Sequence, residues 1–266
     1  MTPPVLYEVT GRVATVTLNR PEVLNAVTMD MEDLLVERLQ VADRDPGVGA
    51  IVLTGAGRGF CAGDDVKAQW DDPRMSQALE LLGGPAAALS PFVDVLLRVT
   101  TPTVAAVNGP AVGLGMDLAL LCDVRLAAPQ ARFSQGYVRM GLLPDIAGLW
   151  LLPRVVGSSA AAELLLTGDV VDAAQAAELG LVSRVVPAEG LVADAQRLAG
   201  RIAALPPLAV AATKEGLRRA VGVTTDGLDD LAAIRGVRLR DLFRTADHRE
   251  AVAAFTEKRA PRFTGS

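Results

Sequence analysis

The order of apolar and polar positions predicts strands and helices that alternate along most of the chain. Residues 12–19, "RVATVTLN", alternate β-branched with other side chains and end at a turn, which is typical of a strand. Further short apolar runs predict strands at 50–55, 103–109, 123–128 and 181–187, and helical patterns lie between them at 28–43, 114–123, 158–168 and 172–180. This alternation indicates an α/β protein with a covered, largely parallel sheet.

The pattern changes after Pro187, where the strand signals stop. Apolar residues at helical spacing then predict amphipathic helices at 191–221, 228–244 and 249–259. We therefore divide the chain into an α/β core at 1–195 and an all-helical region at 196–266. The segment from Trp70 to Pro91 is rich in Pro and Gly, which predicts a mobile region beside a site.

Composition narrows the class of protein. The chain has 266 residues, of which 50% are hydrophobic, enough for one large core. No apolar run is long and pure enough to span a bilayer, and the first residues do not resemble a signal peptide, so we expect a soluble, cytoplasmic protein. A net charge of −5 argues against nucleic-acid binding, which needs a basic face.

Few side chains are available for metal or nucleophilic chemistry. Two cysteines and one histidine make a structural zinc site or a Ser-His-Asp triad improbable. We interpret Cys61 and Cys122 as small buried hydrophobic residues, and His248 as a surface or capping residue before a helix. Base chemistry must then come from carboxylates.

Two glycine-rich junctions follow predicted strands. In "IVLTGAGRGFCAGDDV", Gly63 either serves a loop with positive φ or lets backbone N–H groups around Asp64 approach a ligand. In "AAVNGPAVGLGMDLALLCD", a helix begins near Gly113, and its N–H groups could stabilise an oxygen that gains negative charge. Asp117 in the first turn either complements the helix dipole or takes part in chemistry.

Asp145 interrupts the nearly apolar stretch "VRMGLLPDIAGLWLLPR". A buried carboxylate is costly unless it is bonded, paired or used. Two interpretations stay open, a cap for the helix that follows and a catalytic base, and one residue can be both.

Taken in order and at their spacing, these motifs resemble the enoyl-CoA hydratase/isomerase (crotonase) family. The resemblance rests on "IVLTGAGRGFCAGDDV", "TPTVAAVNGPAVGLGMDLALLCDVRLAA", "ARFSQGYVRMGLLPDIAG" and "AAELGLVSRVVP", with "VTLNRPEVLNAV" and "REAVAAFTEKR" at the two ends. It implies a crotonase-like spiral of repeated ββα units and a C-terminal helical region that packs between subunits. Homotrimers or dimers of trimers would follow.

The resemblance also implies an acyl-CoA thioester as substrate. Coenzyme A is part of that substrate, and no separate cofactor or metal is expected. The thioester oxygen would enter an oxyanion hole formed by the backbone N–H groups of Asp64 and Leu114. Leu114 replaces the glycine usual in the family, so this hole requires a negative φ there.

The acidic positions depart from the hydratase pattern. Asp117 stands at the first of two glutamate positions that orient and activate water, and Tyr137 stands at the second. Asp145 stands where several isomerases of the family have an aspartate. One carboxylate in apolar surroundings can take a proton from one carbon and return it to another. The resemblance therefore favours an enoyl-CoA isomerase with Asp145 as proton shuttle and Asp117 assisting, while Tyr137 lines the acyl pocket or binds the substrate.

Other positions match family contacts to the substrate. The chain of the family passes near adenine at Leu24, Asn25 and Ala26, and it lines the CoA and acyl pocket at Asp65, Val66 and Lys67. Lys258 matches a position near the CoA phosphates of a neighbouring subunit, although a solvated helix charge explains it equally well.

Three competing functions stay open. The first is an enoyl-CoA hydratase (a lyase) with an atypical acid pair, and the second is an aspartyl nucleophile of the kind that dehalogenates aromatic acyl-CoAs. Aromatic residues make up only 4% of the chain, which disfavours the second. The third is a non-catalytic acyl-CoA binder, against which the two acids and both oxyanion segments argue.

Overall fold

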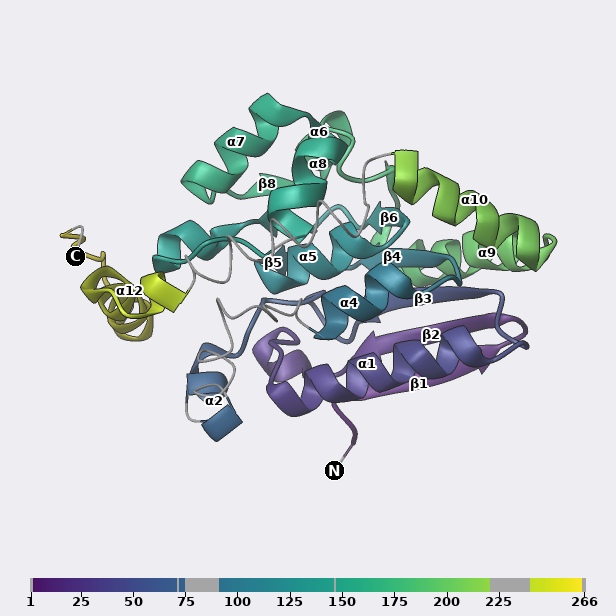
Figure 1. Ribbon diagram of the computed structural model, residues 1–266, viewed down its shortest axis with the longest axis horizontal. Coiled ribbons are helices and arrows are strands. Elements are labelled where there is room, and N and C mark those ends of the chain that lie inside the picture. The colour runs from purple at the N-terminus through teal and green to yellow at the C-terminus, as the bar shows by residue number, and fades with distance from the viewer. Residues whose placement is uncertain (1, 71, 75–90, 146, 221–239, 265–266) are drawn as a thin grey trace.

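A six-stranded sheet forms the centre of the molecule (Figure 1). The computed structural model describes residues 2–70, 72–74, 91–145, 147–220 and 240–264. Strand β1 runs antiparallel to β2, and every later neighbour in the sheet is parallel. The strand order is β1 (Val5–Thr10), β2 (Val13–Leu18), β3 (Ala50–Gly55), β4 (Thr103–Val107), β6 (Val124–Ala127) and β9 (Arg184–Val185). The predicted strands and the largely parallel sheet are confirmed.

A second, smaller sheet was not predicted. It joins β5 (Pro110–Val112), β7 (Arg132–Ser134) and β8 (Val171–Asp172). Strands of two or three residues are too short to show a period of two, so the sequence pattern does not reveal them. This sheet matters because β5 leads directly into the helix that carries Asp117.

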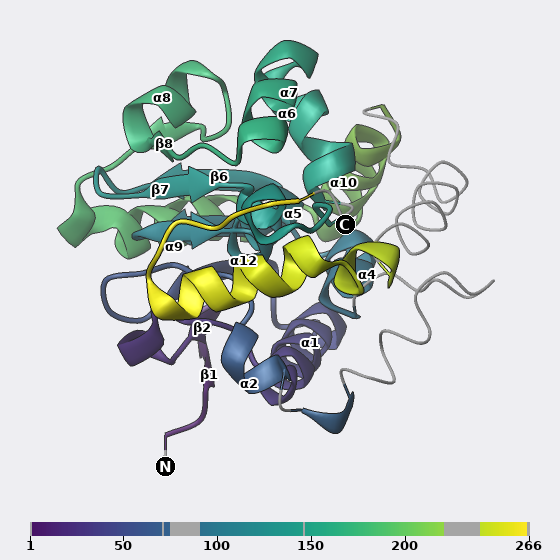
Figure 2. The same ribbon diagram turned by 90° about the vertical axis from the view of Figure 1, so that its left-hand side faces the viewer.

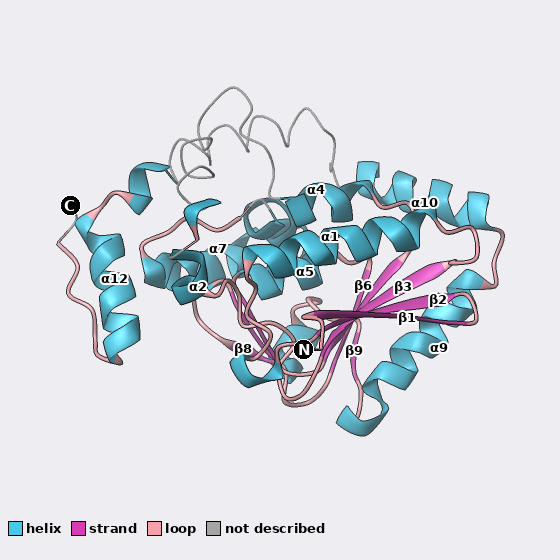
Figure 3. Ribbon diagram, turned by 90° about the horizontal axis from the view of Figure 1, so that it is seen from below, coloured by secondary structure: helices cyan, strands magenta, loops and turns pink. Residues whose placement is uncertain are grey.

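Each face of the main sheet has its own core. In β3, Ile51 and Leu53 face a large cluster that includes side chains of α1, α4 and α5, whereas Ala50 and Val52 face a cluster formed with α9. This is the alternation expected of a strand covered on both sides. Figure 3 shows α1 and α4 on one side of the sheet and α9 on the other.

The helices agree with the predicted pattern in the described part of the chain. The predicted helices correspond to α1 (Met29–Arg44), α5 (Leu114–Leu121), α7 (Ser158–Thr167), α8 (Ala173–Glu178), α9 (Leu191–Ala203), α10 (Pro207–Ala220) and α12 (Ala246–Glu257). Three more are α2 (Val66–Trp70), α4 (Pro91–Arg98) and α6 (Leu152–Val156), and the short turns are η1 (Pro21–Val23), η2 (Gly136–Met140), η3 (Ala147–Leu151) and η4 (Ala188–Gly190).

The proposed division after residue 195 falls inside α9. This helix packs its Ala195, Ala199 and Ala203 against the main sheet. The division into two regions stays a prediction, although α9 itself belongs to the packing of the core. Most of the segment from Trp70 to Pro91, and most of 228–244, lie outside the described residues.

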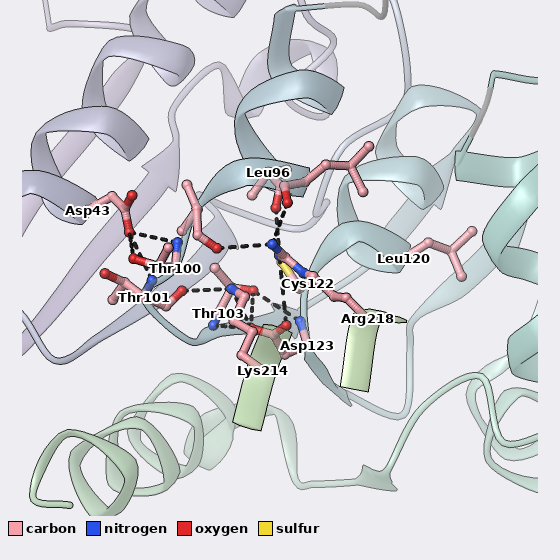
Figure 4. Close-up of polar contacts among 12 residues, drawn as sticks. Asp43, Leu96, Thr100, Thr101, Thr103, Leu120, Cys122, Asp123, Lys214 and Arg218 are labelled. Carbon is pink, nitrogen blue, oxygen red and sulfur yellow. Dashed lines mark hydrogen bonds and ion pairs between the residues drawn. The ribbon is translucent and has the colours of Figure 1, made fainter. Parts of the chain in front are cut away.

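Two cations attach α10 to the sheet and to α4 (Figure 4). The buried Lys214 ammonium donates to the Thr101 carbonyl at 2.7 Å and pairs with Asp123 at 2.7 Å. The Arg218 guanidinium donates to the carbonyls of Leu96, at 2.7 Å, and of Leu97, both at the end of α4. These carbonyls have no partner within their own helix, so Arg218 acts as a C-terminal cap.

Helix α12 lies apart from the main sheet, at the left of Figure 1 and in front in Figure 2. The prediction that His248 lies on the surface is wrong, because only 2% of this residue is exposed. Its Nδ1 lies 2.7 Å from the Met140 carbonyl of η2. A Cβ on Gly141 would lie 3.1 Å from the His248 Cα, so this glycine permits the close approach. Within the described residues, no helix combines the length and apolarity that a membrane span requires.

Candidate active site

The two glycine-rich junctions meet in the folded chain. The Val112 N–H donates to the Cys61 carbonyl at 3.0 Å, and an isolated bridge pairs Cys61 with Ala111. A Cβ on Gly115 would lie 2.0 Å from the Cys61 oxygen, and one on Gly63 would lie 2.9 Å from the Val112 oxygen. Only glycine fits such backbone approaches. The contact brings the segment of Asp64 beside the start of α5.

The structure describes the backbone at both predicted donors, and their role as an oxyanion hole stays a prediction. Leu114 is the first residue of α5, where helical N–H groups lack an intrahelical acceptor. It is not among the residues with positive φ, which meets the condition set by the sequence. An isolated bridge pairs Asp64 with Val27, and its hydrogen bonds are made by the residues on either side, Gly63 and Asp65.

Asp117 is completely buried, and both of its carboxylate oxygens accept hydrogen bonds. Gln135 Nε2 donates to one oxygen at 2.9 Å, and the Tyr137 hydroxyl donates to the other at 2.7 Å. Burial first, and then the charge of Asp117, hold the pKa of Tyr137 well above its usual value of 10.0. Tyr137 therefore stays a neutral donor at physiological pH.

Asp145 is 4% exposed and stands just before η3. Its carbonyl accepts from the Leu149 N–H at 3.0 Å, so Asp145 lies at the start of a helical segment, and its capping and catalytic roles both stay predictions. Asp64 and Asp145 also raise the pKa of Tyr137. The three aspartates therefore lie close enough to Tyr137 to act on it, and the fold gathers them from separate segments.

A fourth acid, Glu32, was not predicted. It lies in the first turns of α1, and one of its oxygens, Oε1, is buried with no hydrogen-bond partner among the described residues. Burial, and after it the charge of Asp64, raise the pKa of Glu32 to about 7, and Asp145 contributes to the same shift. Acids are common at helix N-termini for the dipole alone, so no pattern in the sequence distinguishes Glu32.

Hydrogen bonds hold the segment that is predicted to pass near adenine in one defined conformation. Leu24 and Asn25 both have positive φ, of 53° and 59°. The buried Asn25 amide donates to the Gly59 carbonyl at 2.8 Å and to the Phe60 carbonyl at 3.2 Å. Ala26 accepts from Arg20 at 2.6 Å through its carbonyl. These contacts fix the segment against the loop before Gly63, and its contact with adenine stays a prediction.

The predicted CoA contacts are distributed over two helices. Asp65 pairs with Arg20 at 2.9 Å and accepts from the Ala68 N–H, which gives it a local role at the start of α2. Val66 is the first residue of α2, and Lys67 is exposed on it. Lys258 is exposed at the end of α12 with a φ of 55°. Contact of these residues with CoA stays a prediction.

This architecture and these motifs define a class of protein. Residues 8–266 match the model of the enoyl-CoA hydratase/isomerase family, and the chain belongs to that family. The predicted fold is thereby confirmed, and the substrate class is acyl-CoA.

The names of its relatives include an isomerase of an epoxyphenylacetyl-CoA and a probable enoyl-CoA hydratase. The chain is 40% identical over 261 residues to the 1,2-epoxyphenylacetyl-CoA isomerase of Escherichia coli, covering 98% of each chain. It is 38% identical over 260 residues to a probable enoyl-CoA hydratase of Mycobacterium bovis, covering 98% of this chain and 97% of the relative. The crystal structure of an enoyl-CoA hydratase/isomerase from Pseudoalteromonas atlantica superposes with a TM-score of 0.86 at 33% identity, covering 98% of this chain and 100% of the other.

Proposed function

We propose that this protein is an enoyl-CoA isomerase in which Asp145 is the base that takes the α-proton of the acyl group, after which a proton is added at another carbon. One observation carries the proposal. The position of the second hydratase glutamate holds Tyr137, and its hydroxyl is engaged with Asp117 at 2.7 Å. A pair of facing glutamates that would activate water is therefore absent from these two positions, while the buried Asp145 lies near Tyr137.

In the proposed reaction, the N–H groups of Asp64 and Leu114 hold the thioester oxygen. Each such donor typically contributes about 3–4 kcal/mol to stabilising the transition state. Asp145 removes the α-proton of a 3-enoyl-CoA, and the negative charge passes to the thioester oxygen as the dienolate forms. Protonation at C4 then gives the conjugated 2-enoyl-CoA. Asp117, held by Gln135 and Tyr137, orients the site.

The test compares purified protein on a 3-enoyl-CoA and on a 2-enoyl-CoA, with products identified by chromatography and mass. We expect the 3-enoyl substrate to become its conjugated isomer with no change in mass. Addition of water to the 2-enoyl substrate as the faster reaction would contradict the proposal.

Hydration is the second candidate, because a relative at 38% identity is named a probable hydratase. In that case Asp117 or Asp145 would activate water in a rearranged site. The same experiment separates the two, because hydration adds the mass of one water molecule and isomerisation adds none.

We also propose that the chain assembles as a homotrimer or a dimer of trimers, as the family resemblance implies. Leu205, Leu208 and Leu217 support this, because they expose apolar side chains on and just before α10, with 54%, 85% and 64% of each residue accessible in the single chain. Light scattering coupled to size-exclusion chromatography would give the mass directly, and a monomer would contradict this proposal.

A further inference from the structure

The start of α1 is bound to the loop that carries Asp64. The Val27 N–H donates to the Gly63 carbonyl at 2.9 Å, and the Asp65 N–H donates to the Val27 carbonyl at 2.8 Å. Gln69 Nε2 donates both to the Val27 carbonyl, at 3.1 Å, and to Asp64 Oδ1, at 2.9 Å. These bonds fix the beginning of α1 relative to the Asp64 segment.

Glu32 extends from this part of α1 toward α4. The backbone N–H of Phe92, in the first turn of α4, donates to its carboxyl group. Its oxygen Oε1 makes no hydrogen bond within the described residues, although it is buried. A buried carboxylate with an unpaired oxygen is costly, and the cost falls when the group carries a proton.

The charges around Glu32 also favour its protonated form. Asp64 from the loop, Asp33 from its own helix and Asp145 from the segment before η3 all raise its pKa, after burial, while the Phe92 N–H lowers it. The resulting pKa of about 7 lets this carboxyl group carry a proton at neutral pH and also release it. An acid or base works best when its pKa lies near the working pH.

We propose that Glu32 is a second catalytic residue of this site, the general acid that protonates the distal carbon after Asp145 has removed the α-proton. The proposal rests on the proposed isomerase function and deepens it: Asp145 stays the base, and transfer from Glu32 replaces the return of the same proton by Asp145. The family-like motifs do not include Glu32, and its place in the site follows from the contacts of α1 with the Asp64 loop and of Glu32 with α4.

The proton balance of the step is simple. The C2–H bond breaks, its proton goes to the Asp145 carboxylate, and its electron pair enters the dienolate. The O–H bond of the Glu32 carboxyl group breaks, and a new C4–H bond forms. Asp145 then holds a proton and Glu32 is ionised, and exchange with water returns both groups to their starting states. No oxidant or other co-reactant is needed.

Two-group transfer leaves an isotopic signature. If Asp145 alone carried the proton, deuterium at C2 would reappear at C4 of the product. If Glu32 supplies the second proton, C4 receives hydrogen from water and the deuterium is lost to solvent.

The experiment uses full-length protein and 3-hexenoyl-CoA dideuterated at C2, in ordinary water. We expect wild-type product with hydrogen at C4. Glu32→Gln should lower kcat about 100-fold, because an acid–base group typically contributes at least that much. Its residual product should carry deuterium at C4. Glu32→Gln should also remove the fall in wild-type activity that deprotonation of Glu32 causes above about pH 7.

Two controls keep a structural role apart from a catalytic one. Glu37→Gln changes an acid of the same helix whose side chain is 58% exposed, and it should leave rate and label unchanged. Hexanoyl-CoA has no double bond to move, so exchange of its α-protons with heavy water depends on Asp145 and not on Glu32. The Glu32→Gln protein should retain this exchange.

Each contrary outcome has its own meaning. Deuterium at C4 of the wild-type product, or a Glu32→Gln rate equal to wild type, would overturn the role of Glu32 while the isomerase function stands. Loss of α-proton exchange in Glu32→Gln would also overturn it, because the change would then act through the structure. A wild-type protein that does not isomerise 3-hexenoyl-CoA would remove the isomerase function and this proposal with it.

Discussion

Asp117 and Glu32 are two acids whose surroundings differ, since Asp117 is fully buried and Glu32 only partly. Asp117 lies at the start of α5, and both of its oxygens accept hydrogen bonds, from Gln135 and from Tyr137. Glu32 lies in α1, and its Oε1 is buried without a partner among the described residues. Hydrogen bonds to a carboxylate favour its charged form, whereas burial without them favours the protonated form. The comparison separates an acid whose two oxygens are hydrogen-bonded from one that has an unbonded oxygen and a raised pKa.

The largest effect in this comparison should follow from Asp117→Ala. The change leaves the Gln135 amide and the Tyr137 hydroxyl without their buried acceptor. Unsatisfied buried groups typically cost about 1–3 kcal/mol each, so we expect the free energy of unfolding to fall by about 4 kcal/mol. Chemical denaturation measures this loss. Asp117→Asn keeps an acceptor oxygen and is the matched control, and an equal loss in both variants would contradict the role of these hydrogen bonds.

For Glu32→Gln we expect a smaller change in the free energy of unfolding, and in the stabilising direction. The folded state raises the pKa of Glu32 from 4.5 to about 7, so the folded protein binds this proton more tightly than the unfolded chain. Wild-type stability therefore falls as the pH rises from about 4.5 through about 7. The uncharged variant avoids this loss, and above pH 7 it should be more stable by up to about 3 kcal/mol.

Unfolding curves of Glu32→Gln and wild type between pH 4 and pH 9 measure that difference. The gap should close toward the acidic end, where the wild-type carboxyl group is protonated in both states. A difference that does not vary with pH would show that Glu32 is not the titrating group.

The smallest effect is expected for Tyr137→Phe. The variant keeps the ring and removes one donor to Asp117, and a hydrogen bond to a charged group typically contributes about 1.5–3 kcal/mol to stability. We expect a loss of about 2 kcal/mol in unfolding free energy and a kcat within about threefold of wild type. A much larger loss of turnover, measured on the folded variant, would show that the hydroxyl group takes part in the chemistry.

The local pattern of apolar and polar residues predicts most strands and helices of the main sheet, and it does not predict the short strands or the burial of His248. The alternation in Val13–Leu18 and the helical period in Met29–Arg44 each mark one element, because burial against the core imposes that period. The sheet of β5, β7 and β8 has strands too short to carry a period. The prediction that His248 lies on the surface is wrong because its burial depends on α12 packing over Gly141, a contact between residues far apart in sequence.

The candidate site shows the same division. Gly63, Asp64, Leu114, Asp117 and Asp145 could be selected from motifs, since each lies in a glycine-rich junction or interrupts an apolar run. Glu32 could not, because an acid at the start of a helix has an ordinary explanation in the dipole. Its surroundings arise only when α1, α4 and the Asp64 loop come together.

Asp145→Asn provides the most direct test of the central claim, that Asp145 is the base of an isomerase. The variant keeps the size of the side chain and removes its ability to accept a proton. We expect conversion of 3-hexenoyl-CoA to fall at least about 1,000-fold, within the range typical of a general base, while calorimetry shows CoA binding within about threefold of wild type. Wild-type turnover by the folded Asp145→Asn protein would contradict the account and leave Asp145 as a helix cap.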